Sequence, residues 1–183
     1  MRFTTVLQMT RANLELLRKN WTEAIRSVDA LDVQVQDAPT KLEIRVIRCV
    51  AVTGMNNKAL FGKACAGLSD AVNNCRASLR SQGLLAAASA ELKFGSPDAA
   101  ATVAKQAYDE ATPNGRFETQ FKASVLIARS LHDRGKTREA VMAAKLADDA
   151  LQQQMTRLTS DFRSSYLKRP DIESDLTSTG RIK

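Results

Sequence analysis

Small residues recur in register at four places along the chain. Gly135 is followed by Ala140 and Ala147, at offsets of five and twelve residues. Three earlier sets repeat these offsets, although the first set begins with lysine: Gly95, Ala100 and Ala107; Gly54, Ala59 and Ala66; and Lys19, Ala24 and Leu31. Residues seven apart share one face of a helix, and small side chains there let a neighbouring helix come close. The recurrence therefore predicts an array of helical hairpins.

The composition favours the same fold. Hydrophobic residues make up 44% of the 183 residues but aromatic residues only 5%, so Ala, Leu and Val must build the core. This mixture suits closely packed helices better than sheets. The short Val-Gln alternation between Asp32 and Pro39 is more consistent with a helix that continues toward Pro39 than with a strand. We therefore expect an almost wholly helical protein.

A family resemblance follows from the same positions. A small residue in a first helix, glycine at the turn and alanines five and twelve residues later resemble the tetratricopeptide (TPR) repeat, as in Ala128, Gly135, Ala140 and Ala147. The resemblance covers about residues 4–155. The alanines at the offset of five, Ala24, Ala59, Ala100 and Ala140, lie 35, 41 and 40 residues apart. The usual TPR interval is about 34 residues. The resemblance implies an all-α fold, a right-handed α-solenoid of about four antiparallel helical hairpins with a C-terminal capping helix.

We expect a single domain of residues 1–169, with hairpins at about 4–38, 39–79, 80–114 and 115–169. The second helix of the second hairpin should run from Asn57 to about Leu79. A ladder of apolar residues should continue the last helix and cover the final hairpin: Leu151, Met155, Leu158 and Phe162. Pro170 should stop that helix, and residues 170–183 are expected to form a partly disordered tail.

The two ends of the chain suggest its context. Near the C-terminus, Phe162 is followed by Leu167 and Arg169-Pro170, which resembles the closing segment of TPR arrays in bacterial signalling and regulatory proteins. The first helix is apolar on more than one face, whereas the end units of a solenoid need a polar outer face. We therefore expect either the C-terminal part of a longer bacterial protein or self-association through the leucines of this helix, Leu14, Leu16 and Leu17.

The sequence offers few groups for catalysis. Its one histidine, His132, is expected at a helix end, and no GxGxxG, GxxxxGK[ST], GxSxG or HExxH motif occurs. Cys49, Cys65 and Cys75 lack the close spacing of metal ligands, and we expect all three to be reduced and mostly buried. Reduced cysteines favour a reducing compartment. We predict that the protein is not an enzyme and has no cofactor.

The net charge of +7 raises the question of nucleic acid or an anionic membrane surface as a partner. Basic residues are interleaved with acids and no basic run exceeds two residues, which favours a solvated helical surface. A nucleic-acid binder remains an alternative, although few aromatic residues are placed to stack on bases. The sequence has no secretory signal and no apolar run of about 18 residues, so we expect a cytoplasmic protein without a membrane partner.

The TPR resemblance also implies a site. In TPR proteins the first helices of the hairpins line a concave groove, and the inward positions carry over to these residues: Asn13; Lys41, Ile44 and Arg48; Gln82 and Leu85; and Lys122, Val125, Arg129 and His132. Basic side chains with apolar spots between them suit an extended or helical peptide that carries carboxylates. We therefore predict a protein–protein interaction module that binds a peptide or another domain of its own chain. A self-associating structural element is the alternative.

Overall fold

In the computed structural model, residues 3–73 and 75–182 are described, and these residues are helical without a strand. The helices are α1 (Phe3–Leu17), α2 (Trp21–Asp32), α3 (Ala38–Gly54), α4 (Lys58–Cys65), α5 (Leu68–Ala71), α6 (Ala77–Phe94), α7 (Pro97–Ala111), α8 (Phe117–Asp133), α9 (Thr137–Thr156), α10 (Ser160–Leu167) and α11 (Pro170–Gly180). The predicted all-α class is confirmed. None of these helices combines the length and the apolar character that a membrane crossing needs.

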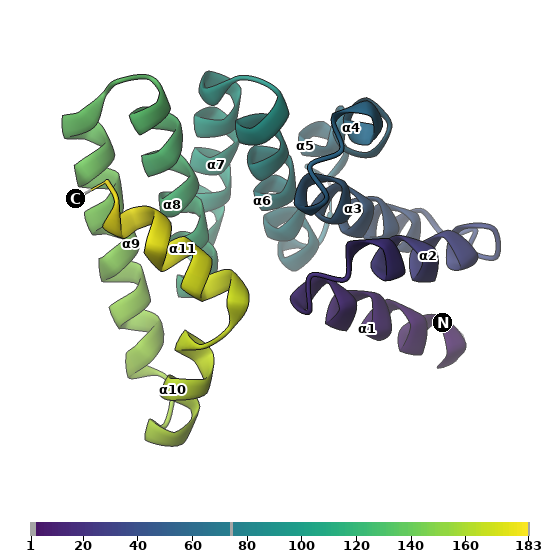
Figure 1. The fold of residues 1–183 in the computed structure, drawn as a ribbon. Helices are drawn as coiled ribbons and strands as arrows, with labels where there is room; N and C mark the ends of the chain where they lie inside the picture. The colour runs from purple at the N-terminus through teal and green to yellow at the C-terminus, as the bar shows by residue number, and fades with distance from the viewer. Residues whose placement is uncertain (1–2, 74, 183) are drawn as a thin grey trace.

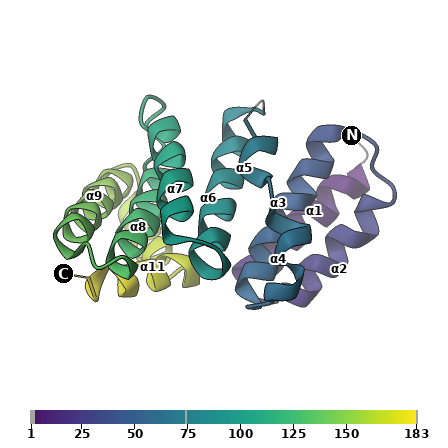
Figure 2. The same cartoon turned by 90° about the horizontal axis from the view of Figure 1, so that it is seen from above.

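The helices pack as successive antiparallel pairs (Figure 1). Helix α2 packs on α1, α4 on α3, α7 on α6 and α9 on α8. Neighbouring pairs meet where the second helix of one pair packs on the first helix of the next, as α2 does on α3 and α7 on α8. The first helices also contact one another, because α1 contacts α3, α3 contacts α6 and α6 contacts α8. Figure 2 shows the resulting row of helices from above. The helices α1, α3, α6 and α8 therefore form one continuous layer, and this layer carries all ten predicted groove residues.

Buried alanines hold the later pairs together. Ala140, Ala144 and Ala147 of α9 are completely buried, and so are Ala100 and Ala107 of α7. Small side chains let the helix backbones approach closely, which increases the packing contacts between them. The predicted docking face is therefore confirmed in these two pairs.

The second pair departs from the expected pattern. Ala59 and Ala66 are exposed, and α4 ends at Cys65 instead of continuing toward Leu79. Gly67 follows with φ of 66°, a left-handed conformation that costs other residues about 1 kcal/mol or more. The expected long helix is therefore wrong, because Gly67 breaks it and starts the short helix α5.

A disulfide joins Cys49 of α3 to Cys65 at the end of α4. The prediction of three reduced cysteines is therefore wrong for these two, while Cys75 is free. Residues 16 positions apart in the sequence come together only because α3 and α4 form a hairpin. The disulfide removes the argument that reduced cysteines made for a reducing compartment.

Two junctions explain how the first pairs are joined. Trp21 lies against Gly54, where a side-chain Cβ would come within 2.6 Å of the indole ring. Any larger residue at position 54 would displace Trp21, so the glycine serves close packing between α2 and α3. The helix expected to continue toward Pro39 is wrong, because α2 ends at Asp32 and the side chain of Asp37 caps α3 by accepting a hydrogen bond from the Thr40 amide at 3.0 Å.

The C-terminal segment returns to the array. Helix α9 ends at Thr156, the ladder does not extend to Phe162, which is 67% exposed, and Pro170 begins α11 instead of preceding a tail. Helix α11 packs on α8 and crosses the front of the last pair in Figure 1. The expected partly disordered tail is therefore wrong over residues 170–180. The helix that covers the final pair is α11.

Candidate functional site

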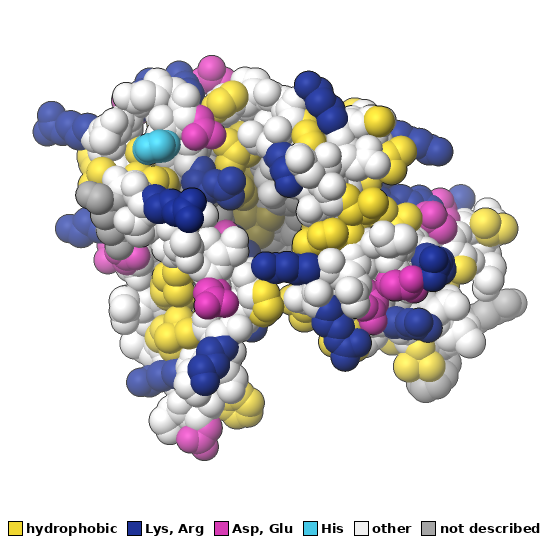
Figure 3. Space-filling view, viewed as in Figure 1, with side chains coloured by type: hydrophobic (Ala, Val, Ile, Leu, Met, Phe, Trp, Pro, Cys, Tyr) yellow, Lys and Arg dark blue, Asp and Glu magenta, His cyan; other side chains and the backbone are white. Residues whose placement is uncertain are grey.

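The ten predicted groove residues lie on the four helices of the continuous layer. Asn13 is on α1; Lys41, Ile44 and Arg48 are on α3; Gln82 and Leu85 are on α6; and Lys122, Val125, Arg129 and His132 are on α8. The space-filling view shows a hollow between the α8–α11 part and the α1–α3 part, with hydrophobic side chains in it and Lys and Arg side chains around it (Figure 3). The individual residues, however, have different surroundings.

Two of the ten residues belong to the core. Ile44 is completely buried with Val28 and Leu31, and Val125 is completely buried beside Phe121 and Ile172. Their side chains stabilise the packing of helix pairs and are not open to a partner. The expectation that they line an open groove therefore does not hold.

Arg48 is held by the neighbouring helix α2. Its guanidinium lies 2.6 Å from a carboxylate oxygen of Asp29 and 2.8 Å from one of Asp32. Burial alone would lower the pKa of Arg48, but the hydrogen bonds and charges of the two aspartates outweigh this effect and raise it. Arg48 therefore joins α3 to α2, and each of its three guanidinium nitrogens already meets a carboxylate of α2.

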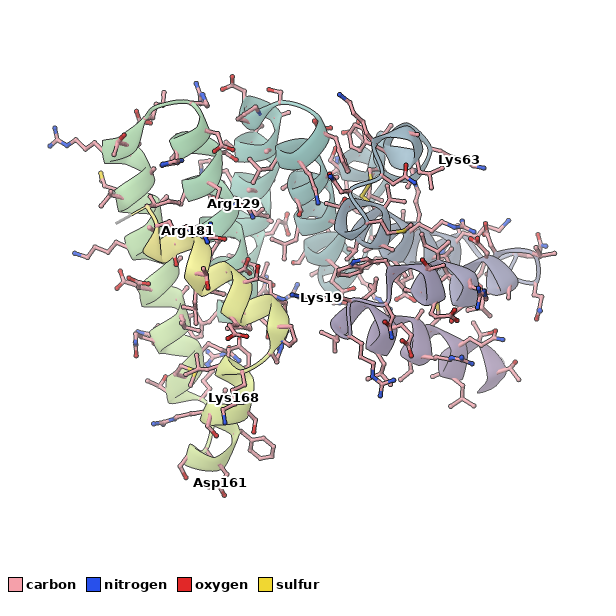
Figure 4. The ribbon with its side chains drawn as sticks, viewed as in Figure 1. Lys19, Lys63, Arg129, Asp161, Lys168 and Arg181 are labelled. Carbon is pink, nitrogen blue, oxygen red and sulfur yellow. A yellow bond between two sulfur atoms is a disulfide. The ribbon has the colours of Figure 1, made fainter. Side chains whose placement is uncertain are left out.

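Four of the predicted residues are exposed and separate from one another. Asn13 lies on α1, Lys41 in the first turn of α3, and Arg129 and His132 toward the end of α8. His132 lies 3.7 Å from a carboxylate oxygen of its neighbour Asp133. Figure 4 shows Arg129 on α8 close to the C-terminal end of α11. No hydrogen bond or ion pair within the described part of the chain joins these four residues to each other.

The remaining three residues converge. Gln82 and Leu85 of α6 and Lys122 of α8 line one open pocket of about 530 Å³. The rest of its lining comes from the start of α8 and the end of α9: Asn114, Gly115, Arg116, Phe117, Glu118, Thr119, Gln154 and Arg157. We call this cavity the α6–α8 pocket. A second pocket of about 580 Å³ contains none of the ten predicted residues.

Two arginines give the α6–α8 pocket its charge. The guanidinium of Arg157 lies 4.3 Å from the ring centre of Phe117 and donates a hydrogen bond to the Gly115 carbonyl at 2.9 Å. Arg116 donates to the Ser81 hydroxyl at 3.1 Å. Each arginine has five N–H groups, so both keep donors that these contacts do not use. The stacked ring fixes the position of Arg157 at the pocket wall.

The start of α8 adds a second source of positive potential. Arg116 precedes Phe117 and its side chain does not cap the helix, so it leaves the backbone N–H groups of the first turn without a capping partner from this residue. Helix N-termini and arginines both favour carboxylates and phosphates. Leu85 and Phe117 supply apolar surface within the same pocket. The pocket can therefore bind an anionic group that is attached to an apolar one.

Lys122 also belongs to an ion-pair cluster that holds α11. Its ammonium lies 3.0 Å from Glu118 and 2.8 Å from Asp171, the second residue of α11. Arg169 donates to both Glu118 oxygens, at 2.8 and 3.2 Å, and to both Asp171 oxygens, at 2.7 and 3.1 Å. The cluster therefore places a carboxylate of the chain itself beside one wall of the α6–α8 pocket.

The cluster shifts the titration of its members. Burial would raise the pKa of Asp171, but the hydrogen bonds from Arg169 and Lys122 and the charge of Lys122 hold it well below its usual value. The pKa of Glu118 is lowered in the same way, because Lys122 and Arg169 outweigh its burial. Burial would lower the pKa of Lys122, yet Glu118 and Asp171 raise it. All members therefore stay charged at neutral pH.

Three pocket residues that the sequence did not point to, Arg116, Phe117 and Arg157, lie at the ends of helices. Arg116 and Phe117 follow the Pro113-Asn114-Gly115 turn, and that turn was a signal that a helix begins there. Arg157 lies in the turn after α9, where the sequence predicted a continuing helix. Among the described residues, no group of three His, Cys, Asp or Glu side chains is placed to hold a metal ion.

Comparisons with known proteins give no match: no protein-family model fits the chain, and neither a curated protein nor a solved structure is significantly similar to it.

Proposed function

We propose that this chain is a non-enzymatic protein-interaction module, a TPR-like α-solenoid that binds an acidic peptide segment of a partner protein. The binding site is the α6–α8 pocket. A carboxylate of the peptide lies between Arg116, Arg157 and the first turn of α8, and an apolar side chain contacts Leu85 and Phe117.

The observation that supports this proposal most is the convergence on the pocket. Gln82, Leu85 and Lys122 were selected from the sequence as partner-contacting positions on two different helices, and all three line one cavity. The two arginines and the helix start give that cavity a positive potential, which attracts carboxylates. A charge pair of this kind at an interface adds specificity and a modest part of the affinity.

The experiment uses a change at Gln82, which is exposed, so a substitution there should leave the fold intact. Random peptides are selected on the wild-type chain, and the best binders are titrated into the wild type, Gln82→Glu and Gln152→Glu. Gln152 is exposed on α9, outside the pocket, so it is a control with the same change in charge.

We expect the selected peptides to be rich in Asp and Glu. A new carboxylate in the pocket should repel them by about 1 kcal/mol, which weakens binding by roughly fivefold in Gln82→Glu and not in Gln152→Glu. Selected peptides without an excess of acids, or equal affinities for the two variants, would reject the pocket.

A second candidate function is self-association through α1. Four large apolar side chains of this helix are exposed by 46–52%: Val6, Leu7, Leu14 and Leu17. Their positions lie within one side of the helix, and about half of each side chain is open to solvent. Leu16, which was also expected to self-associate, packs against the core of the first pairs. This side of α1 is a candidate interface between two copies of the chain.

Sedimentation velocity tests this second candidate. If α1 drives association, the wild-type chain should form a dimer at micromolar concentration, and Leu14→Glu should return it to a monomer without loss of helix content. A monomeric wild type across the accessible concentration range would exclude it.

A further inference from the structure

Helix α11 covers an apolar surface formed by the last helix pair. Ile172 is completely buried among Phe121 and Val125 of α8 and residues of α9. Just beyond the C-terminal end of α11, Ile182 packs on a group of small residues: Ala128, Ala140, Ala143 and Ala144. Without α11, this shallow surface would be open to solvent. We call it the α8–α9 face.

The α8–α9 face has basic residues along its α8 side, and α11 presents acids to them. Lys122 binds Asp171, as described above, and Lys122 and Arg129 both act on the charge of Asp175. Helix α11 is therefore an amphipathic helix whose apolar residues Ile172 and Leu176 alternate with the acids Asp171 and Asp175 at helical spacing.

Asp175 is not well satisfied at this position. Its side chain is partly buried, and among the described residues its carboxylate makes no hydrogen bond or ion pair within 4 Å, although the charges of Lys122 and Arg129 lower its pKa. Burial is the main cause that raises the pKa of Asp175, to about 6, so at neutral pH a partly buried negative charge opposes the packing of α11. Helix α11 thus matches the α8–α9 face in its apolar residues and in the charge of Asp171. The charge of Asp175 makes it pack less tightly than a helix with a neutral residue at that position would.

We propose that the α8–α9 face is a docking site for an acidic amphipathic helix of a partner protein, and that α11 is the chain's own competitor for that site. A partner helix with apolar residues at the positions of Ile172 and Leu176 and an acid at the position of Asp171 would make the same contacts. It would displace α11 if it carried a neutral residue at the position of Asp175. This proposal does not depend on the α6–α8 pocket.

The test measures binding of a fluorescein-labelled peptide of residues 170–182 to the full chain by fluorescence anisotropy. In one full-chain variant, Ile172→Glu, a charge at the buried position expels α11 and leaves α8 and α9 unchanged. The matched control is Thr177→Glu, which puts the same charge at an exposed position of α11. Circular dichroism monitors the helix content of both.

We expect Ile172→Glu to bind the peptide at least tenfold more tightly than the wild type, and Thr177→Glu to resemble the wild type. A peptide with Asp175→Asn should bind roughly tenfold more tightly than the native peptide at pH 8, because no charge has to be partly buried at that position. Gln82→Glu should leave the affinity for either peptide unchanged, which separates this result from that for the pocket.

Several outcomes would overturn the proposal. One is an Ile172→Glu chain that keeps its helix content but binds no peptide at about 1 mM, or binds it no more tightly than Thr177→Glu does. If Ile172→Glu loses its helices, the Asp175→Asn peptide is titrated into the wild type instead. Absence of binding at about 1 mM would then also overturn the proposal. A wild-type dimer that Ile172→Glu abolishes would assign the face to α11 of a second copy and overturn the assignment to a partner.

Discussion

At the scale of single residues, two aspartates of α11 titrate in opposite directions. The pKa of Asp175 is raised to about 6, mainly by burial, so its packing against α8 weakens as the pH rises from its ordinary pKa of 3.8 through 6. The pKa of Asp171 is lowered by Arg169 and Lys122 against the effect of burial, so its contribution is lost as the pH falls below about 4. Helix α11 should therefore pack more tightly near pH 5 than at pH 8.

Replacement of Asp175 by Asn tests this sign. The free energy of unfolding, measured in urea at pH 5 and pH 8, should be higher for Asp175→Asn than for the wild type at both values. The difference should be about 1 kcal/mol larger at pH 8, because more of the wild-type carboxylate is then ionised. Glu173→Gln is the control, since Glu173 is exposed on the same helix. Parallel pH profiles for wild type and Asp175→Asn would contradict a raised pKa.

At the scale of helices, the sequence predicted the pairs α6–α7 and α8–α9, in which alanines at regular spacing form one face of the second helix. Ala140 and Ala147 are buried where their spacing placed them, because small residues on one face determine how closely two helices pack. The break at Gly67 was not predicted, since a glycine inside a helical pattern is compatible both with a close contact and with a left-handed turn. Pro170 was equally ambiguous, because proline that ends one helix also favours the first turn of the next.

The disulfide belongs to the same scale, because it joins α3 to the interrupted helix α4. Closing a loop of this length restricts the unfolded chain and is expected to contribute on the order of 3 kcal/mol. Reduction with dithiothreitol should therefore lower the urea midpoint of the wild type. A Cys49→Ala, Cys65→Ala double variant should be as unstable as the reduced wild type and should not respond to dithiothreitol. A midpoint that is insensitive to reductant in the wild type would show that the disulfide does not stabilise the fold.

At the scale of the whole molecule, consecutive helix pairs place α1, α3, α6 and α8 side by side and leave surfaces between them. Of the ten groove positions predicted from the sequence, three line the α6–α8 pocket, and two are completely buried in the core. Position along a helix predicts which way a side chain faces. It does not predict that α11, a distant segment, returns to cover part of α8.

The most direct test of the account is to map an acidic peptide on the chain by NMR chemical-shift perturbation. Titration of a selected acidic peptide into the ¹⁵N-labelled protein should shift the amide signals of Gln82, Leu85, Phe117 and Thr119 most. At a peptide concentration below the wild-type Kd, these shifts should be roughly fivefold smaller in Gln82→Glu. Shifts centred on α1, or on the outer side of α7 and α9, would contradict recognition of carboxylates at the α6–α8 pocket.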